Sequence, residues 1–506
     1  MADTKLTELT EATEVGSDDL LYVVSGGDSR KVTKTTLLSD TYSVAAAFIW
    51  DRDTKFPAAV NTRTLPPAML GNLYNQMRGC VLNSDGSVNY YLSPTDWSQK
   101  AGGGASDLTG ADGNVMVEIP KFYYRQSRAG SLYTWEISFV SLPGFTLHPA
   151  FEKDGSEVAT RYYSAYEGCL KFERSITAVA DAGGGDITVT TSVQHPLYAG
   201  DSVTISGTTS YDGTYTVVTR ASTTTFTVTA TFVATETGTA AGYVSGKNLD
   251  DMTANLQTGT DELASVKSQY PLVSVTRAEC RSLASNVGTG WRQLDFTLWS
   301  AVQMLYLIES QTFYSQNVLG DGNTKSGYFP SSDNQNDSPH TIAGAGDAIG
   351  NGSTDTISGA GVDAKPGTSF MKYRGIENLY GNCWNWADGI NINVSSTGNV
   401  HITNDASDFA DDTSTNMDLI ASTLPTGNDY IRDLLPSEGV FLASNISGSN
   451  ASQYITDLHT GSTSSNRVAA VGGGAVAGGV PWGVFHLDAS YSSSSADRMI
   501  CGRLSF

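Results

Sequence analysis

Polar and apolar residues alternate with a period of two along a stretch in the middle of the chain. The alternation is clearest in four runs, residues 186–190, 201–205, 213–218 and 225–229, with turn-forming residues between them. Successive side chains of a β-strand point to opposite faces, so each run predicts a strand with one buried face. Short strands at this spacing are typical of a small β-sandwich or barrel. We therefore expect residues 174–247 to form an all-β module inserted into the chain.

The convincing helical patterns come after this module. Thr276 and Glu279 have the spacing of a capping box, in which each side chain satisfies a free backbone amide of the first turn. The helix that they begin is expected to run to about Asn286 and to stop at Gly288. A second helix, from about residue 296 to 311, is apolar on nearly all sides, which predicts that it is buried on most faces.

A short hairpin is predicted near the N-terminus. Two β-prone runs, residues 20–24 and 29–32, flank Gly26-Gly27, and glycine readily adopts the positive φ angles of a tight turn. A segment of about forty residues cannot bury a core of its own. We expect residues 1–44 to pack against copies of themselves or against a docking partner. The apolar residues that need such a partner are Leu20, Tyr22 and Val24.

The segments on either side of the inserted module are predicted to form one domain. Residues 45–173 contain aromatic-rich strands such as 117–124 and 132–137, and residues 248–506 supply the two helices. Residues 320–370 are rich in Gly, Asn, Asp and Ser, which is typical of long ordered loops or of partial disorder and not of a core. The expected fold class is thus a mixture of α+β and all-β parts.

The charge of the chain narrows the partners that it can have. The sequence has 30 Lys and Arg residues against 52 Asp and Glu residues, a net charge of −22, and the basic residues form no cluster. Nucleic acid is not expected as a partner, because phosphates are bound by concentrated Lys and Arg. The longest apolar run, around residues 298–308, is too short to span a membrane. Residues 1–30 lack the basic start and apolar core of a signal peptide.

Candidate catalytic and metal-ligating residues are few. The five cysteines are widely spaced without a CxxC pair, which is typical of buried thiols in a reducing compartment. The six histidines show no metal-ligand spacing. Arg374 is expected to pair with Glu377 or Asp388, and the acidic run from Asp405 to Asp412 to be a solvated loop. We expect no catalytic residue, no metal ion and no cofactor.

Two stretches together carry a resemblance to a known family. The first runs from Tyr373 to Ile392 and includes Gly381-Asn382-Cys383-Trp384-Asn385-Trp386, and the second comprises residues 472–474, 478–486 and the C-terminal Cys501-Gly502-Arg503-Leu504-Ser505-Phe506. With Gly290-Trp291-Arg292-Gln293, they resemble the C-type lectin fold of bacteriophage receptor-binding proteins. They are similar to the variable proteins of diversity-generating retroelements, of the major tropism determinant kind. The resemblance covers roughly residues 250–506 and implies a C-type lectin-like domain whose first part is residues 45–173.

Two other segments resemble parts of phage structural proteins. Residues 200–207 and 211–215 resemble an Ig-like or small-barrel module inserted into many of them. Residues 1–44 resemble the attachment segment of tail and head fibres. The resemblance implies a homotrimer, because fibres of this type are trimeric, and it implies contact with other virion structural proteins through residues 1–44.

A receptor-binding face is predicted just before the terminal Gly-Arg-Leu. In the family resembled, this segment is the diversified ligand-binding face, which corresponds here to about residues 466–498. Large aromatic residues beside small hydroxyl residues also make an adaptable binding surface, as in antibody loops. The residues predicted to bind the receptor are Trp482, Phe485, His486, Asp488, Ser490, Tyr491 and Ser493. Trp482 and Tyr491 are the expected anchors, because aromatic residues dominate interface hot spots.

A second set of residues is predicted to be structural. Trp384 and Trp386 are two positions apart, so they should lie on the same side of an extended strand. Large buried indoles contribute much of the packing energy of a core. We expect these two residues and Arg503 to control folding rather than binding.

The sequence therefore predicts a non-enzymatic phage virion adhesin. It is expected to be made in the host cytoplasm, to form a tail fibre or another exposed appendage, and to bind a host-cell surface receptor, either a protein or a glycan. The alternatives are a structural fibre or decoration protein without a receptor role, and a polysaccharide-degrading tailspike. The repeats of about 20–50 residues that tailspike solenoids carry are missing from the sequence.

The functions of two protein classes that share the resembled fold are not expected for this chain. A calcium-dependent sugar lectin needs a Glu-Pro-Asn or Gln-Pro-Asp triplet, which the sequence lacks. Formylglycine-generating enzymes share the Gly-Asn-x-Trp-x-Trp pattern but use paired cysteines near the C-terminus. This chain has only Cys501 there, and a lone thiol without an activating neighbour does not support catalysis.

Overall fold

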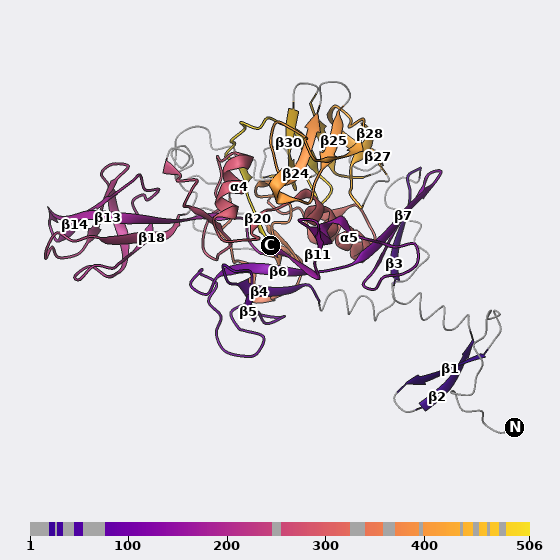
Figure 1. Ribbon diagram of the computed structural model, residues 1–506, viewed down its shortest axis with the longest axis horizontal. Helices are drawn as coiled ribbons and strands as arrows, with labels where there is room; N and C mark the ends of the chain where they lie inside the picture. The colour runs from indigo at the N-terminus through magenta and orange to yellow at the C-terminus, as the bar shows by residue number, and fades with distance from the viewer. Residues whose placement is uncertain are drawn as a thin grey trace.

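The computed structural model describes residues 20–25, 28–33, 45–53, 76–244, 255–323, 340–357, 370–393, 398–435, 439–448, 455–462, 466–474 and 482–506. Strands predominate over helices, so the structure is β-rich, which is consistent with the expected mixture of α+β and all-β parts. The chain forms a main body, a barrel that projects from one side of it, and a separate N-terminal hairpin (Figure 1).

The N-terminal hairpin has the strands that the sequence predicts. β1 (Leu20–Ser25) pairs antiparallel with β2 (Asp28–Thr33). The side chains of Leu20, Tyr22 and Val24, and most of residues 1–44, lie outside the described residues. The role of this hairpin in attachment stays a prediction.

One sheet of the main body combines strands from both sides of the inserted module. Its order is β20-β33-β12-β6-β4-β5, with bounds β4 (Arg78–Leu82), β5 (Val88–Tyr91), β6 (Asn114–Pro120), β12 (Thr160–Ser164), β20 (Arg292–Gln293) and β33 (Leu504–Ser505). β33 lies between β12 and β20, and Tyr163 of β12 pairs with Ser505. The C-terminus of the chain is therefore part of a sheet that early residues build.

Further sheets complete the main body. A four-stranded sheet, β3-β8-β7-β9, consists of β3 (Ala45–Asp51), β7 (Tyr123–Ala129), β8 (Leu132–Ser138) and β9 (Thr146–Leu147). A nine-stranded sheet has the strand order β26-β25-β24-β30-β31-β29-β27-β28, and its ninth strand, β32, pairs with β24. Its bounds are β24 (Trp384–Asn393), β25 (Asn399–Ile402), β26 (Asp418–Ala421), β27 (Gly427–Leu434), β28 (Ala443–Gly448), β29 (Leu458–Gly461), β30 (Asn466–Val471), β31 (Leu487–Tyr491) and β32 (Ile500–Cys501). The small pairings are β10 (Glu152–Lys153) with β11 (Ser156–Glu157), and β21 (Thr354–Ile357), β22 (Phe370–Tyr373) and β23 (Ile376–Glu377).

The inserted module is a closed barrel. Its strands are β13 (Cys169–Gly183), β14 (Asp186–Thr191), β15 (Ser202–Ser206), β16 (Gly213–Arg220), β17 (Thr225–Thr229) and β18 (Gly238–Val244). They follow the order β14-β17-β16-β15-β18-β13, and β13 also pairs with β14, which closes the sheet on itself. Buried and more exposed residues alternate along β14, β15 and β17, as the period of two predicts. Of the two predicted forms, the barrel is the one observed.

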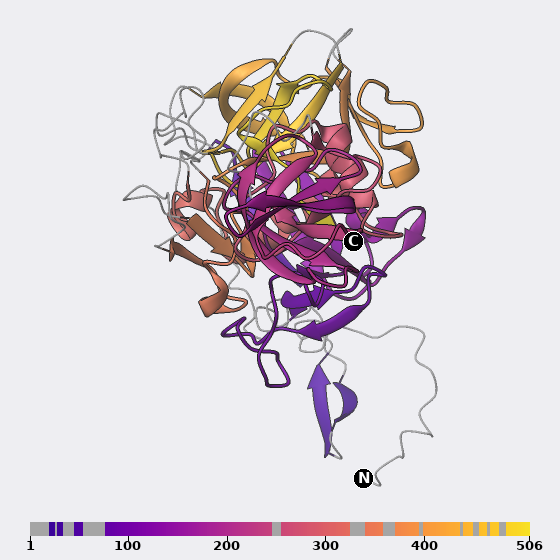
Figure 2. The same ribbon diagram turned by 90° about the vertical axis from the view of Figure 1, so that its left-hand side faces the viewer.

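The barrel is continuous with the main body in Figure 1, and in Figure 2 it lies in front of the main body, toward the viewer. β13 runs without a break through the boundary expected at residue 174, and its first residues pair with β19 (Glu262–Ala264) of the main body as well as with β18. Arg174 is buried and forms a bidentate ion pair with Asp261. Its Nη2 lies 2.8 Å from Oδ2 of Asp261. The junction is thus a shared strand with a buried ion pair.

The two predicted helices are present. α4 (Arg277–Ser285) begins at the capping box of Thr276 and Glu279, and α5 (Phe296–Ser310) is buried along nearly its whole length. Asp295 caps α5, because its side chain accepts from the backbone N–H of Leu298 at 2.8 Å. The shorter helices are α6 (Ser315–Leu319), η3 (Pro149–Phe151), η4 (Asp347–Ile349) and η5 (Ala406–Asp408). Among the described residues, none of these helices has the length and hydropathy of a membrane span.

Two large apolar cores hold the molecule together. One surrounds α5 and includes the inner faces of the sheets around it. The other begins inside the barrel, with residues such as Val189 and Phe226, and continues through Phe172 to Trp384 and Trp386 of β24. The barrel and the tryptophan motif therefore belong to one continuous core.

Candidate functional site

Four of the seven residues predicted to bind a receptor are buried. Trp482, Phe485, His486 and Asp488 are 7%, 2%, 0% and 8% exposed. The other three, Ser490, Tyr491 and Ser493, are half-buried. The prediction of one exposed face across the whole set is therefore wrong for the first four, because their side chains point into the main body.

His486 is held in the interior by two hydrogen bonds. Its Nδ1 lies 2.7 Å from the carbonyl oxygen of Leu458, and its Nε2 lies 3.2 Å from the indole nitrogen of Trp384. An indole N–H can only donate, so Nε2 accepts and Nδ1 carries the proton. Burial lowers the pKa of His486 to about 3, against the raising effect of the Leu458 carbonyl. The neutral imidazole joins β24 to β29 and does not face solvent.

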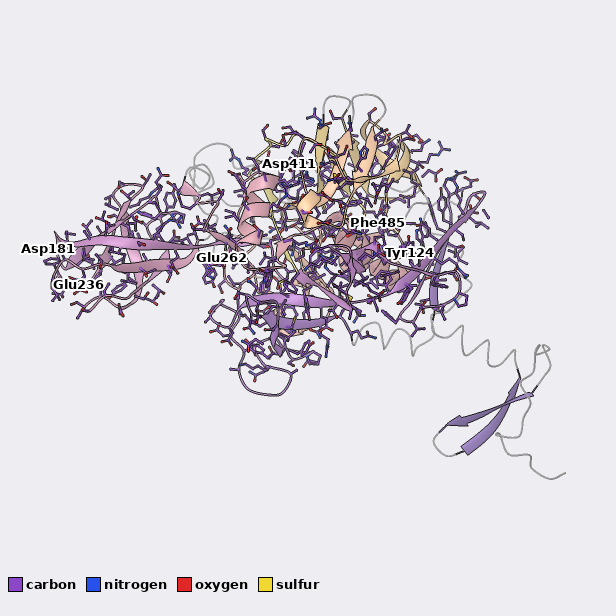
Figure 3. The ribbon with its side chains drawn as sticks, in the orientation of Figure 1. Tyr124, Asp181, Glu236, Glu262, Asp411 and Phe485 are labelled. Carbon is purple, nitrogen blue, oxygen red and sulfur yellow. The ribbon has the colours of Figure 1, made fainter. Side chains whose placement is uncertain are left out.

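Trp482 and Phe485 pack into aromatic clusters. The ring of Trp482 meets Trp384 edge-on, with centroids 5.4 Å apart, and lies 4.3 Å from the ring of His486. Phe485 meets Phe313 edge-on, with ring centroids 4.8 Å apart. Figure 3 shows Phe485 within the main body. Aromatic pairs at these separations stabilise a core by more than the burial of their apolar surface alone would. Both residues therefore belong to the scaffold.

An ordered polar turn follows these buried residues; we name residues 490–498 the serine turn. The backbone N–H and the hydroxyl of Ser490 both donate to Asp488 Oδ1, at 2.9 and 2.6 Å. The N–H of Ser495 donates to the carbonyl of Ser492 at 3.0 Å, and the N–H of Ser492 donates to the Ser495 hydroxyl at 3.1 Å. Ser494, between them, is exposed. The turn thus presents hydroxyl groups on a fixed backbone.

Tyr491 connects the serine turn to the scaffold. Its ring meets Trp386 edge-on, with centroids 5.4 Å apart, and its backbone lies opposite Val468 in the β30–β31 ladder. Trp386 is fully buried and donates from its indole nitrogen to the carbonyl of Val275 at 2.9 Å. One side of Tyr491 is therefore fixed by packing while part of the side chain stays at the surface.

Arg503 ties the C-terminal strand to the tryptophan motif. Its side chain is 0% exposed and donates to the side-chain oxygen of Asn385 at 2.9 Å. It also donates to the carbonyls of Glu377 and Asn378, at 2.6 and 2.7 Å. This position fits the structural role predicted for Arg503.

Glu377 and Asp388, the two carboxylates expected to pair with Arg374, have other partners. Arg374 pairs with Glu309 of α5. Glu377 accepts from backbone N–H groups of the loop at residues 344–346, and Asp388 pairs with Arg281 at 2.6 Å. The pairing expected from sequence placed Arg374 with carboxylates close to it in the chain, whereas α5 brings Glu309 to it from further away.

One member of the acidic run predicted to be solvated is part of the fold. Asp411 pairs with Arg277 at 2.8 Å and with Arg281 at 2.9 Å, and both arginines belong to α4. Figure 3 shows Asp411 beside this helix. Arg277 is 0% exposed, so Asp411 compensates a buried charge, and the solvated interpretation is wrong for this residue.

A buried polar cluster around Glu167 was missed by sequence reasoning. Glu167 Oε2 accepts from the amide groups of Asn382 and Asn378, the latter at 3.3 Å, and Oε1 accepts from the backbone N–H of Cys383 at 3.2 Å. Burial raises the pKa of Glu167 to about 7, and the charge of Arg503 lowers it. Glu167 and Asn378 are 211 positions apart, so no local pattern in the sequence points to this cluster.

A narrow crevice reaches the carboxylates of Glu167 and Glu377. Its other walls are Tyr166, Gln269, Pro271, Thr341, Ala343 and Asn378, and it has no room for a water molecule. General acid–base catalysis requires a group within hydrogen-bond reach of the substrate or of water. These two carboxylates therefore have no access to a substrate in this structure.

A wider groove lies where the barrel joins the main body. Its volume is about 400 Å³, and its floor includes Lys171, Glu173 and Tyr243 of the shared strands. The Tyr243 hydroxyl donates to the carbonyl of Gly110 at 3.2 Å, which links the floor to a loop of the main body. Aromatic, charged and hydroxyl side chains all line this groove.

The serine turn is the candidate binding surface that best agrees with both the sequence and the burial pattern. A scan against protein-family models gives no match, and a search of curated proteins gives none either.

Proposed function

We propose that this protein is a bacteriophage virion adhesin that binds a host-cell surface receptor and has no enzymatic activity. The observation that carries the proposal is the serine turn, which exposes hydroxyl groups directly after a strand fixed by buried aromatic residues. Binding surfaces of this kind combine adaptable polar contacts with a rigid support. The proposed receptor is a glycan or a protein on the host surface.

The receptor-binding residues that we propose differ from the full predicted set. Tyr491 is the aromatic anchor, and Ser490 and Ser493 are the polar contacts beside it. The exposed Ser494 and Asp497 extend the surface. The buried aromatic residues before the turn act through the scaffold, because they hold the strand from which the turn projects.

We propose that the main body has a C-type lectin-like fold. The resemblance depends on two stretches, and the structure adds that they lie side by side. β24 and β32 pair in parallel, with Asn385 opposite Cys501, and Arg503 donates to the side chain of Asn385. Two motifs that are distant in sequence therefore form one structural unit, as a shared fold requires.

We propose attachment to the virion through residues 1–44 and assembly as a homotrimer. Several copies on one particle convert weak individual binding into tight attachment, because each bound copy raises the effective concentration of the next. Light scattering of the full-length chain is expected to give the mass of a trimer. A monomeric mass would contradict this part of the proposal.

The non-enzymatic assignment has support from the buried carboxylates. Glu167 and Glu377 are the pair that a crevice brings together, and that crevice has no room for water. A retaining or inverting glycosidase needs two carboxylates on either side of an accessible bond. A polysaccharide-degrading tailspike and a structural decoration protein remain the competing functions.

Binding to cells separates these functions. Labelled full-length protein is expected to bind cells of the host bacterium, and an antibody against residues 490–498 is expected to compete with that binding. An antibody against the barrel strand β16 is the control and should leave binding unchanged. Release of sugars from host polysaccharide would indicate a tailspike, and absence of binding to host cells would indicate a decoration protein.

A further inference from the structure

Two cysteines that are far apart in sequence meet beside a buried glutamate. Cys383 directly precedes β24 and Cys501 ends β32, and the parallel pairing of these two strands brings both thiols together. The Sγ atoms of both cysteines and a carboxylate oxygen of Glu167 all lie within 4.8 Å of one another. All three side chains are buried. Such a cluster differs from isolated core cysteines, because a carboxylate faces the two thiols.

The spacing of these atoms is close to that of a tetrahedral zinc site. Zinc–sulfur bonds of about 2.3 Å place tetrahedral ligands about 3.8 Å apart. The three atoms therefore need to approach one another by about 1 Å or less, which small side-chain rotations can provide. The Cys501 thiol donates to the side-chain oxygen of Asn385 at 3.4 Å, so this oxygen lies next to the cluster.

The charges around the cluster balance when zinc is present. Two thiolates and the Glu167 carboxylate carry three negative charges, and Zn²⁺ with the guanidinium of Arg503 carries three positive charges. Arg503 reaches the cluster through Asn385, to which it donates at 2.9 Å. A buried site that is neutral overall avoids the large cost of an uncompensated charge.

We propose that Cys383, Cys501 and Glu167 bind one zinc ion that joins three distant segments of the main body. Thiolate and carboxylate ligands together favour Zn²⁺ over Mg²⁺ or Ca²⁺, which prefer oxygen ligands alone. The ion has a structural role, because the protein surrounds it and leaves no open position for a substrate. Its burial means that it enters as the chain folds, as in other structural zinc sites.

Metal content of the full-length protein tests the proposal without any variant. The chain is expressed in cobalt-supplemented medium and purified under reducing conditions, because Co²⁺ replaces Zn²⁺ and absorbs light when thiolates bind it. We expect about one cobalt per chain and a thiolate-to-cobalt charge-transfer band. Folded protein that contains neither cobalt nor zinc, or that contains cobalt but lacks that band, would overturn the proposal.

Variants then assign the ligands. Cys383→Ala and Cys501→Ala are each expected to abolish the charge-transfer band, and Glu167→Gln is expected to weaken cobalt binding at least tenfold while the band persists. Cys80→Ala is the matched control, since Cys80 is equally buried and lies outside the cluster. A band that survives in the folded double variant of Cys383 and Cys501 refutes the site. If that variant does not fold, the cobalt content and spectrum of the Cys80→Ala and unsubstituted chains decide the question.

Discussion

Arg503 donates its Nε hydrogen to the side-chain oxygen of Asn385 at 2.9 Å, across 118 positions of the sequence. The bond connects the last residues of the chain to the centre of the tryptophan motif. Because Arg503 is 0% exposed, its charge depends on this bond and on the three backbone carbonyls that it also reaches. The C-terminus is therefore part of the core and supports the strands beside it.

Replacing Arg503 is expected to destabilise the main body strongly. Arg503→Ala leaves several buried acceptors without donors, and each unsatisfied group costs about 1–3 kcal/mol. We expect the free energy of unfolding to fall by about 3–5 kcal/mol, as for other broken buried charge networks. Lys171→Ala is the control, because Lys171 forms a partly exposed ion pair with Glu262 and should cost less than about 1 kcal/mol. Equal losses for the two variants in chemical denaturation would contradict this role of Arg503.

Trp482 and His486 are expected to act on stability, in contrast to the sequence-based expectation that they contact a receptor. Trp482→Ala removes an indole packed between Trp384 and His486 and should cost about 3–5 kcal/mol. Ser493→Arg, in the serine turn, should change the free energy of unfolding by no more than about 0.5 kcal/mol. Thermal melting of the two variants separates a scaffold position from a surface position. A melting temperature unchanged by Trp482→Ala would place its indole at the surface after all.

The barrel is expected to be removable only if the strands at its base are kept. Joining Glu173 directly to Lys247 removes β18 and leaves Asp261 without Arg174, and an unpaired buried carboxylate costs about 3–5 kcal/mol. Arg174 and Ala240 lie opposite each other in the β13–β18 ladder, so an Asn-Gly turn can join them in place of residues 175–239.

These two deletions give opposite expectations. The variant with the Asn-Gly turn should keep the melting temperature of the main body within a few degrees. The variant that joins Glu173 to Lys247 should melt at a markedly lower temperature, and Asp261→Asn in that background should recover part of the loss. Collapse of both deletion variants would show that the main body needs the barrel to fold.

Asp457 is expected to make stability depend on pH. Burial raises the pKa of Asp457 to about 8, and the N–H of Phe485, which donates to Oδ2 at 2.7 Å, lowers it only in part. The folded state therefore holds a proton that the unfolded chain loses near pH 4. The contribution of Asp457 to the free energy of unfolding is fully present below about pH 4. It falls by about 1.4 kcal/mol per pH unit as the pH rises toward 8.

Comparison with Asp457→Asn isolates this effect from those of other groups. The melting temperature of Asp457→Asn relative to the unsubstituted protein should increase from pH 5 to pH 8 and level off above pH 8. Asp181→Asn, at an exposed position in the barrel, controls for the loss of one negative charge. If the difference in melting temperature between Asp457→Asn and the unsubstituted protein stays constant with pH, the raised pKa of Asp457 is contradicted.

Local patterns were sufficient to predict much of the secondary structure. The capping box at Thr276 and the apolar run of α5 are set by contacts within a few residues, and both helices form where expected. The strands of the barrel follow from the same kind of pattern, because one face of each is buried. Closure of the barrel depends on the pairing of β13 with β14, which alternation alone does not specify.

The site was harder to predict because burial depends on distant contacts. Phe485 and His486 have the composition of a binding loop, yet Phe313 and Leu458 cover them from other parts of the chain. Glu167 likewise has partners only in the folded chain. Aromatic and hydroxyl residues in one segment indicate a surface only where other elements leave part of them uncovered, as they do at the exposed Ser494 and on one side of Tyr491.

The most direct test of the proposed function is the affinity of the full-length protein for host cells when the serine turn is altered. Ser493→Arg and Tyr491→Ala are compared with Thr219→Arg, an exposed position on the barrel. We predict that both turn variants stay folded and bind at least tenfold more weakly, whereas Thr219→Arg binds like the unsubstituted protein. Unchanged binding by folded Ser493→Arg and Tyr491→Ala would contradict the assignment of the serine turn as the receptor-binding surface.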